Sequence, residues 1–399
     1  MIELLSEHVA NQIAAGEVIQ RPASAVKELL ENAIDAQSTK VQLIVKDAGA
    51  SLVQVMDNGM GMTKEDAEIC FKKHATSKIK NTDDLFSISS KGFRGEALSS
   101  IAAVSQVELK TKKIESDIGH QVKIEASKLV SSEPCAFSNG TSISMRNLFF
   151  NVPARRNFLK SKGVETKHII DEFHRVALTH PEIHFTMHHN NNVVFDLPIT
   201  NTRQRIVSIF GKKYNERLVP VDEETSITKI SGFVLKPEFS KRTRGEQFLF
   251  INNRFIRNNS INHAIKVVFK DLIGNDSFPS YFIYLTVPLD TIDVNIHPSK
   301  TEIKFEDERA VYELVKSSVR SALSRNNIAP SIDFNPETSF DFPPLKTGES
   351  IKIPSIKVDT NYNPFKKENQ SQIRGNIDLL KDNFQKEFEI PENFKEQND

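Results

Sequence analysis

The chain has 399 residues, of which 38% are hydrophobic and 26% are charged, and its formal net charge is zero. This composition is typical of a soluble globular protein, and the length allows two ordinary domains with further segments. No run of about 18 apolar residues occurs, so we expect no membrane span. The start MIELLSEHVANQ has acidic residues where a signal peptide is basic and then apolar, so we expect a cytoplasmic protein.

The distribution of charges and cysteines argues against two further kinds of site. Residues 331–399 hold 9 basic and 13 acidic residues, which leaves 43 and 39 in the first 330. That basic excess is too small for a constitutive high-affinity nucleic-acid binder, so any DNA contact must come from local patches and depend on salt. Cys70 and Cys135 have no CxxC spacing, so we expect plain thiols rather than a disulfide framework or a zinc site.

The first segment, from residue 1 to about 205, alternates helical and strand patterns. In residues 22–36 the apolar side chains recur on one helical face, and Pro22 suits a first helical turn. Strands are expected at 40–49, 51–59, 107–113, 121–126 and 141–148, and further helices at 63–73 and 96–105. These elements predict an α+β fold with helices on one face of a mixed sheet.

A second segment, from about 210 to 330, has the order β-β-α-β-α. The strand patterns lie at 230–236, 247–254 and 280–289 and the helical patterns at 260–273 and 310–323, with the stretch 293–305 before the second helix. This order predicts a second, smaller α/β domain with its own core. After Pro330 the pattern dissolves into prolines, isolated Phe residues and mixed charge, which predicts a disordered linker or tail over 331–399.

The predicted helix at 22–36 carries a candidate catalytic pair. Glu28 and Asn32 are four residues apart, so both project from one helical face. A carboxylate there can take a proton from an attacking water, and a neutral amide can ligate magnesium without adding charge. No GxxxxGK[ST] sequence occurs, so the phosphates are not held by a P-loop. Taken alone, such a pair is more often a solvated helix face.

Three loops supply the other candidates for a nucleotide site. Asp57 closes a strand in DNGMG, where its carboxylate can accept a hydrogen bond from an adenine amino group while Gly59 and Gly61 let the backbone approach the base. KGFRGEAL, at 91–98, places glycines before a helix N-terminus, whose N–H groups favour phosphate oxygens. HATSKI, at 74–79, is a polar stretch that can order over a ligand. Their structural alternatives are a tight turn, a flexible helix cap and a plain surface loop.

The series of motifs resembles the Bergerat-type ATPase superfamily, which includes gyrase-type topoisomerase subunits, a heat-shock chaperone, sensor histidine kinases and MutL. It looks closest to the MutL family of DNA mismatch-repair ATPases. ANQIAAGEVIQRPASAVKELLENAIDA, KHATSKI, GFRGEAL, LFFNVPARRNFLK and DVNIHPSKTEIKF are similar to signature stretches of that family. They are spread over about residues 1–310. The resemblance implies a Bergerat-type sandwich of helices on a mixed sheet, followed by a smaller α/β domain of ribosomal-protein-like βαβ type.

The resemblance also implies a role for individual residues. Glu28 is the general base that activates water, Asn32 is the protein ligand of Mg²⁺, and Asp57 recognises the adenine of ATP. Lys300, in HPSK, is the catalytic lysine that the second domain sends to the γ-phosphate, where it distinguishes ATP from ADP. The other implied nucleotide-binding residues are Gly59, Gly61 and Thr141 beside the base, and Thr76, Ser77, Lys78, Gly92, Phe93, Arg94 and Gly95 in the lid over the phosphates.

The same resemblance implies partners. The stretch HVANQIAAGEVI would order on ATP binding and pack against a second copy of the chain, and the alternative is a helix on its own domain. Arg254, Lys160 and Arg309 match basic positions that contact DNA phosphates without reading the base sequence. Asn253 stands where the family usually has Gly, and Asn also tolerates a left-handed turn. A mismatch-recognition protein of the MutS type is the further partner, and the expected location is the nucleoid within the cytoplasm.

We therefore expect an ATP-dependent switch of DNA mismatch repair, which slowly hydrolyses MgATP, pairs two subunits around DNA and couples mismatch recognition to downstream repair factors. The alternative is an ATP-gated DNA clamp or scaffold in which hydrolysis is incidental. A histidine kinase lacks an HPSK-bearing domain of this kind, and a topoisomerase needs cleavage machinery that is not visible here. The acidic DQHA-type motif of the endonuclease members does not occur in these residues, so we expect no endonuclease in this chain.

Overall fold

The computed structural model describes residues 7–78, 91–92, 94–225, 227–293 and 303–326, with side chains from Gln12 onward. The predicted tail at 331–399 lies outside the described residues, as do two of the predicted site residues, Phe93 and Lys300. Within the described ranges, no helix has both the length and the apolar character that crossing a membrane requires.

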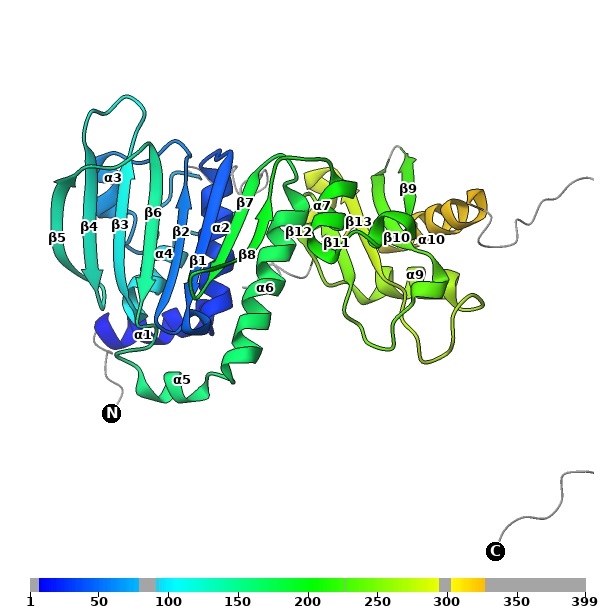
Figure 1. Cartoon of the computed structure of the whole chain (residues 1–399), viewed down its shortest axis with the longest axis horizontal. Coiled ribbons are helices and arrows are strands. Elements are labelled where there is room, and N and C mark those ends of the chain that lie inside the picture. Colours follow the sequence, from blue (N-terminus) through cyan, green and yellow to red (C-terminus); the bar gives the residue numbers. More distant parts are fainter. Residues whose placement is uncertain (1–6, 79–90, 93, 226, 294–302, 327–399) are drawn as a thin grey trace, which may run out of the picture. The chain divides into compact units, whose positions relative to one another are not determined.

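An eight-stranded mixed sheet organises the first part of the chain (Figure 1), with the strand order β5-β4-β3-β6-β2-β1-β7-β8. Its strands are β1 (Lys40–Lys46), β2 (Leu52–Asp57), β3 (Gln106–Lys112), β4 (Gly119–Glu125), β5 (Lys128–Cys135), β6 (Gly140–Arg146), β7 (His184–His189) and β8 (Asn192–Leu197). β1 and β7 run parallel, whereas β1 and β2 run antiparallel. Buried side chains alternate with half-buried ones along β1 and β3, because successive residues point to opposite faces.

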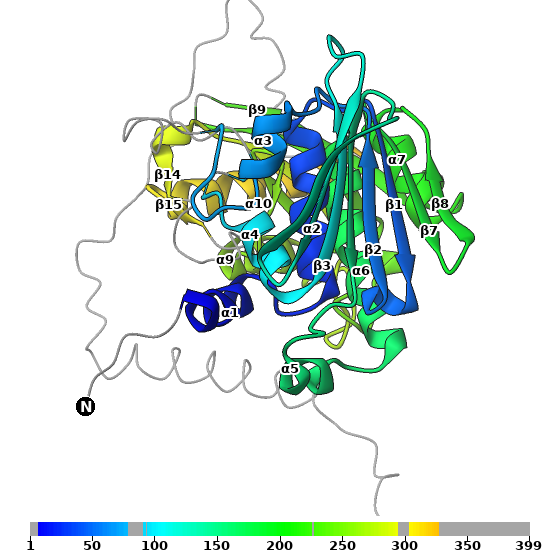
Figure 2. The ribbon, with the colours of Figure 1, turned by 90° about the vertical axis from the view of Figure 1, so that its left-hand side faces the viewer.

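Helices cover one face of this sheet (Figure 2). They are α1 (Glu7–Val18), α2 (Pro22–Asp35), α3 (Lys64–Ile69), α4 (Ala97–Val104) and α6 (Lys162–Thr179). The short α5 (Pro153–Phe158) lies below the end of the sheet and has no buried residue (Figure 1). α2 begins at Pro22, whose missing N–H costs nothing in a first turn, and buries Val26, Leu30 and Ala33 at helical spacing. It packs against β2 and α6. This packing fixes which side of α2 remains available for polar side chains.

The sequence predicts two alternatives for the N-terminal stretch, and packing against a second copy on ATP binding stays a prediction. α1 packs against α4 within the same chain, and Ala15 and Ile19 are buried in the core under the eight-stranded sheet. Residues Gln12 to Val18 therefore form a helix on their own domain in this structure.

A five-stranded mixed sheet organises the second part, with the order β12-β11-β13-β10-β9. Its strands are β9 (Leu218–Glu224), β10 (Lys229–Leu235), β11 (Gln247–Ile251), β12 (Arg254–Phe255) and β13 (Tyr281–Thr286). α9 (Asn259–Phe269) and α10 (Glu308–Arg325) pack together and bury apolar side chains against this sheet. The short strands β14 (Ile292–Asp293) and β15 (Lys304–Phe305) form a separate pair.

A further aromatic core links the two parts. Phe210, at the end of α7 (Thr202–Phe210), contacts Phe248 and Phe282 of the five-stranded sheet, with ring centroids 5.8 and 5.1 Å apart. Leu178 of α6 is buried in the same cluster. The fully buried Arg205 donates hydrogen bonds to the carbonyl oxygen of Ile183 at 2.7 Å, which anchors α7 beside β7. The short α8 (Tyr214–Arg217) follows.

The predicted α+β fold is confirmed, although the prediction omits several elements. β5 and β8 are edge strands with mostly exposed or half-buried side chains, so no alternating pattern marks them. The prediction also omits β7, β9, β12 and the helices α5 to α8. Two predicted helices are shorter than expected, because α3 ends at Ile69 and α9 at Phe269. The predicted domain boundary at 205–210 stays a prediction.

Candidate nucleotide-binding site

One side of α2 carries the predicted catalytic pair and a third polar residue. Glu28, Asn32 and Asp35 follow one another at the spacing i, i+4 and i+7, which places them along one helical face. The Glu28 side chain is 19% exposed, and its Oε1 lies 3.8 Å from the Nζ of Lys27. The Glu28 carboxylate is therefore accessible to a water molecule without being fully solvated.

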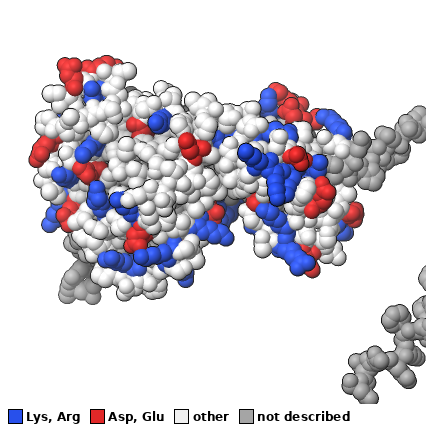
Figure 3. Space-filling model, in the orientation of Figure 1, with Lys and Arg blue, Asp and Glu red and all other residues white. Residues whose placement is uncertain are grey.

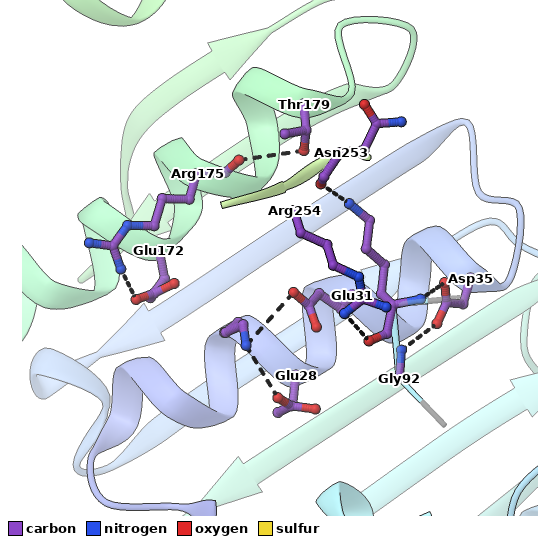
Figure 4. Close-up of polar contacts among 11 residues, drawn as sticks. Glu28, Glu31, Asp35, Gly92, Glu172, Arg175, Thr179, Asn253 and Arg254 are labelled. Atoms are coloured by element: carbon purple, nitrogen blue, oxygen red, sulfur yellow. Dashed lines mark hydrogen bonds and ion pairs between the residues drawn. The ribbon is translucent and has the colours of Figure 1, made fainter. Parts of the chain in front are cut away.

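The carboxylate of Asp35 accepts hydrogen bonds from two loops, and Figure 4 shows the bond from Gly92. Lys78 Nζ donates to Asp35 Oδ2 at 2.5 Å, and the backbone N–H groups of Lys91 and Gly92 donate at 3.0 and 3.2 Å. Lys78 and Gly92 are two of the predicted phosphate-lid residues, and Asp35 brings them together. The sequence prediction omits Asp35, although its position seven residues after Glu28 is a signal that could have found it.

The residues around Asn32 are suited to hold a cation. Lys78 Nζ donates to the Oδ1 of Asn32 at 3.1 Å as well as to Asp35, so an amide and a carboxylate oxygen already share one ammonium group. Oxygen ligands of this kind are the ones that Mg²⁺ prefers. Among the described residues no group of three or more His, Cys, Asp or Glu could hold a metal ion alone. The Asn32 amide oxygen is therefore of the kind that can serve as a magnesium ligand.

Asp57 lies at the end of β2, beside β6. Its register partner across the two strands is Thr141, which is buried and whose Oγ1 lies 3.0 Å from the Oγ1 of Thr111. The backbone N–H of Gly59 donates to Asp57 Oδ1 at 2.8 Å. Burial raises the pKa of the Asp57 carboxyl to about 6, although hydrogen bonds such as the one from Gly59 oppose the rise. The structure thus brings together the residues predicted to surround the adenine.

The pKa of Asp57 predicts how nucleotide binding depends on pH. An ionised carboxylate accepts the adenine amino hydrogen, so protonation below about pH 6 removes the charged acceptor. We expect ATP affinity to be constant above pH 7 and to fall by up to about tenfold per pH unit below pH 6. Calorimetric titrations between pH 5 and 8 would measure this. The slope should disappear in Asp57→Asn, and a slope that persists there would assign the titration to another group.

Two glycines of the loops approach other backbone closely. Gly61 has φ +67°, and a Cβ there would lie 2.2 Å from the carbonyl oxygen of Lys112. Gly95 has φ +64°, and a Cβ there would lie 2.6 Å from the carbonyl oxygen of Ala75. Both positions require glycine because L-residues rarely adopt this backbone and no side chain fits. Gly95 thereby holds the KGFRGEAL loop against the HATSKI loop.

Replacing Gly61 by alanine should destabilise the protein. The left-handed backbone and the overlap with Lys112 together should lower the free energy of unfolding by about 2 to 3 kcal/mol. Gly163→Ala is the matched control, because no atom lies within 4 Å of the added Cβ in α6. That variant should be neutral or stabilised by up to about 1 kcal/mol. Chemical denaturation measures both, and equal stabilities would contradict the role of Gly61.

The lid residues are only partly described. Thr76 Oγ1 accepts a hydrogen bond from the backbone N–H of Lys78 at 3.2 Å, and the carbonyl oxygen of Gly95 accepts one from the N–H of His74 at 3.0 Å. Ser77 is exposed and Arg94 is half-buried. The polar loop and the glycine-rich loop therefore meet next to α2.

The three predicted DNA-contact residues occupy different environments. Lys160, between α5 and α6, and Arg309, in the first turn of α10, are both exposed. Arg254, in β12, is half-buried and donates to the carbonyl oxygen of Lys91 at 3.0 Å. Only Lys160 and Arg309 are thus turned to solvent in this structure.

Comparisons with known proteins show the family to which the chain belongs. The family described as "Histidine kinase-, DNA gyrase B-, and HSP90-like ATPase" matches residues 20–146, and "DNA mismatch repair protein, C-terminal domain" matches 206–324. The chain is 55% identical over 384 residues, 96% of its length, to the DNA mismatch repair protein MutL of Christiangramia forsetii. The chain belongs to the MutL family. It spans 62% of that relative and 58% of the MutL of Flavobacterium johnsoniae, to which it is 54% identical.

Solved structures of MutL proteins share the fold. The Aquifex aeolicus MutL ATPase domain complexed with ADP is 25% identical, with a TM-score of 0.55, and the match covers 76% of this chain and 98% of that one. The N-terminal domain of a DNA repair protein gives a TM-score of 0.69 at 25% identity and covers 80% and 99%. The predicted fold class and family are confirmed. The chain has an ATPase domain of the Bergerat type, which is also called GHKL.

Proposed function

We propose that this MutL-family chain binds MgATP and hydrolyses it slowly, as an ATP-dependent switch in DNA mismatch repair. The observation that carries the proposal is the α2 face, where a half-buried carboxylate precedes an amide and a second carboxylate that gathers the lid donors. Asp57 and Thr141 supply the polar end of a pocket for adenine. Glu28, Asn32 and Asp57 thus have distinct tasks in one site.

In this proposal Glu28 performs the proton transfer. Its carboxylate takes a proton from the water that attacks the γ-phosphate, and the Lys27 ammonium lies 3.8 Å from its Oε1. Lys78 and the N–H groups near Gly92 orient the phosphates. Mg²⁺, when bound at Asn32, neutralises charge on the phosphate oxygens. Lys300, which lies outside the described residues, would contact the γ-phosphate.

DNA binding and partners complete the proposal. Figure 3 shows Lys and Arg side chains gathered across the lower part of the visible face, near α5, which contains Arg155 and Arg156. With Lys160, Arg254 and Arg309 these residues would contact DNA phosphates without reading bases. ATP-dependent pairing through the N-terminal region, coupling to a protein of the MutS type and a cytoplasmic, nucleoid-associated location belong to the same proposal. They are argued from family membership.

The second candidate function is an ATP-gated clamp or scaffold in which hydrolysis is incidental. It shares every binding step with the switch and differs only in whether Glu28 matters for DNA release. If ATP-dependent retention on DNA is equal for the wild type and Glu28→Ala, the clamp is favoured. Faster release by the wild type favours the switch.

Pairing of subunits is tested by the mass in solution. We expect the chain to be monomeric alone or with ADP and dimeric with a non-hydrolysable ATP analogue and Mg²⁺, because only ATP offers a γ-phosphate to close the site. Size-exclusion chromatography with light scattering measures this. A mass that does not change with the analogue would contradict ATP-dependent pairing by this chain.

A further inference from the structure

The turn formed by Lys91 and Gly92 is held on two sides. On one side the Asp35 carboxylate accepts hydrogen bonds from both backbone N–H groups, at 3.0 and 3.2 Å. The proposed function assigns N–H groups of this loop to the phosphates, and in this structure those of Lys91 and Gly92 are paired with Asp35. The position of this turn therefore decides whether they can meet a nucleotide.

On the other side, the turn is bound by the hairpin between β11 and β12. Lys91 is a buried lysine, 9% exposed, and its Nζ donates to the carbonyl oxygen of Asn253. The guanidinium of Arg254 donates back to the carbonyl oxygen of Lys91 at 3.0 Å. Figure 4 shows Arg254 extending toward α2, the helix that carries Asp35. Lys91 therefore donates one hydrogen bond to the hairpin and accepts another from it.

The hairpin is itself rigidly placed. Asn252 and Asn253 have φ +46° and +62°, the left-handed conformation that asparagine tolerates in place of glycine. The side chain of Asn252 exchanges hydrogen bonds with the backbone of Val287, at 2.9 and 3.0 Å. Arg175 of α6 lies over the ring of Phe255 at 4.1 Å. Because the hairpin belongs to the five-stranded sheet, a contact with it couples the position of the Lys91–Gly92 turn to that sheet.

The surroundings of this contact are charged and sheltered. A small pocket is lined by Lys27, Glu31, Lys91, Glu172, Arg175, Val176, Thr179, Asn253, Arg254 and Phe255. Hydrogen bonds between charged groups and backbone are stronger in such a setting than in water. Burial lowers the pKa of Lys91 to about 8, so its ammonium is still mostly charged at pH 7. The contact with Asn253 is therefore charge-assisted.

We infer that Lys91 is a positioning residue of the ATP site, which holds the phosphate-binding turn between Asp35 and the Asn253–Arg254 hairpin, and that Arg254 acts on nucleotide binding through this contact. The inference rests on the proposed function of Gly92. Arg254 would thus have a role in nucleotide binding that does not depend on DNA. A guanidinium has five N–H donors, so Arg254 can contact a DNA phosphate and still donate to Lys91.

The test compares nucleotide affinities of the whole chain without DNA. Lys91→Met removes the ammonium and keeps the length, and Arg254→Gln removes the guanidinium. We expect each to weaken binding of a non-hydrolysable ATP analogue with Mg²⁺ about tenfold, the effect of one charge-assisted hydrogen bond. Adenosine affinity should be unchanged, because Asp57 and Thr141 are intact. The double variant should lose less than the product of the two effects.

Controls and outcomes separate this inference from the function on which it rests. Lys123→Met on β4 and Arg257→Gln after β12 alter exposed residues of the same types and should match the wild type. Unchanged analogue affinity in Lys91→Met would overturn the inference while ATP binding stands. If Arg254→Gln leaves the analogue affinity unchanged, its role at the ATP site is refuted. A wild-type chain that binds no analogue removes the proposed function and this inference with it.

Discussion

Replacing Glu28 by alanine should leave ATP bound but unhydrolysed. Positioned general bases contribute about 100- to 10,000-fold to proton-transfer steps, so turnover should fall by at least about 100-fold. The adenine and phosphate contacts involve other residues, so affinity should change by less than about threefold. Release of inorganic phosphate measures turnover, and equilibrium titration with labelled ATP measures affinity.

The matched control for this variant is Glu65→Ala, which removes an exposed carboxylate in the first turn of α3. It should keep wild-type turnover and affinity. Undiminished turnover in Glu28→Ala would remove Glu28 from its catalytic role. A variant that neither binds nor hydrolyses would instead give Glu28 a part in holding the nucleotide.

Replacing Asp57 by asparagine should damage recognition of adenine. The side chain keeps its size, but the charged acceptor beside Thr141 is lost, and a hydrogen bond to a charged group is worth about 1.5 to 3 kcal/mol. We expect ATP affinity to fall by about 10- to 100-fold. The affinity for GTP should not fall, since the new amide can donate to the guanine O6. Competition titrations with both nucleotides measure the ratio.

Asp117→Asn is the control, because this carboxylate is exposed in the loop between β3 and β4. Its nucleotide affinities should equal those of the wild type. If Asp57→Asn loses ATP and GTP affinity equally, the carboxylate supports the fold of the pocket and does not read the base. Thermal unfolding of both variants distinguishes such a general loss.

The site residues that can be predicted from the sequence are those whose place within one helix or strand indicates their chemistry. Glu28 and Asn32 share a helix, and Asp57 is the last residue of a strand, so these positions alone indicate their chemistry. The apolar spacing of α2 likewise predicted which side of the helix is buried. The wider assignment of lid residues depended on resemblance to a family, because each loop has an ordinary structural explanation.

Contacts between distant parts of the chain could not be predicted in this way. Lys91 and Asn253 are 162 residues apart, and no periodic pattern reports that a lysine and a backbone oxygen meet. Asp35 was within reach, since it lies on the same helical face as Glu28, but its partners come from other loops. The edge strand β5 was missed for a different reason, because it buries too little to show alternation.

ATP should bind between the polar face of α2 and Asp57. Direct titration of the wild-type chain tests this most directly. Isothermal calorimetry with a non-hydrolysable ATP analogue and Mg²⁺ should give one saturable site per chain at pH 7.5. Affinity should be much weaker when Mg²⁺ is chelated, since Asn32 would then lack its ion. Absence of saturable binding up to millimolar analogue would contradict the account.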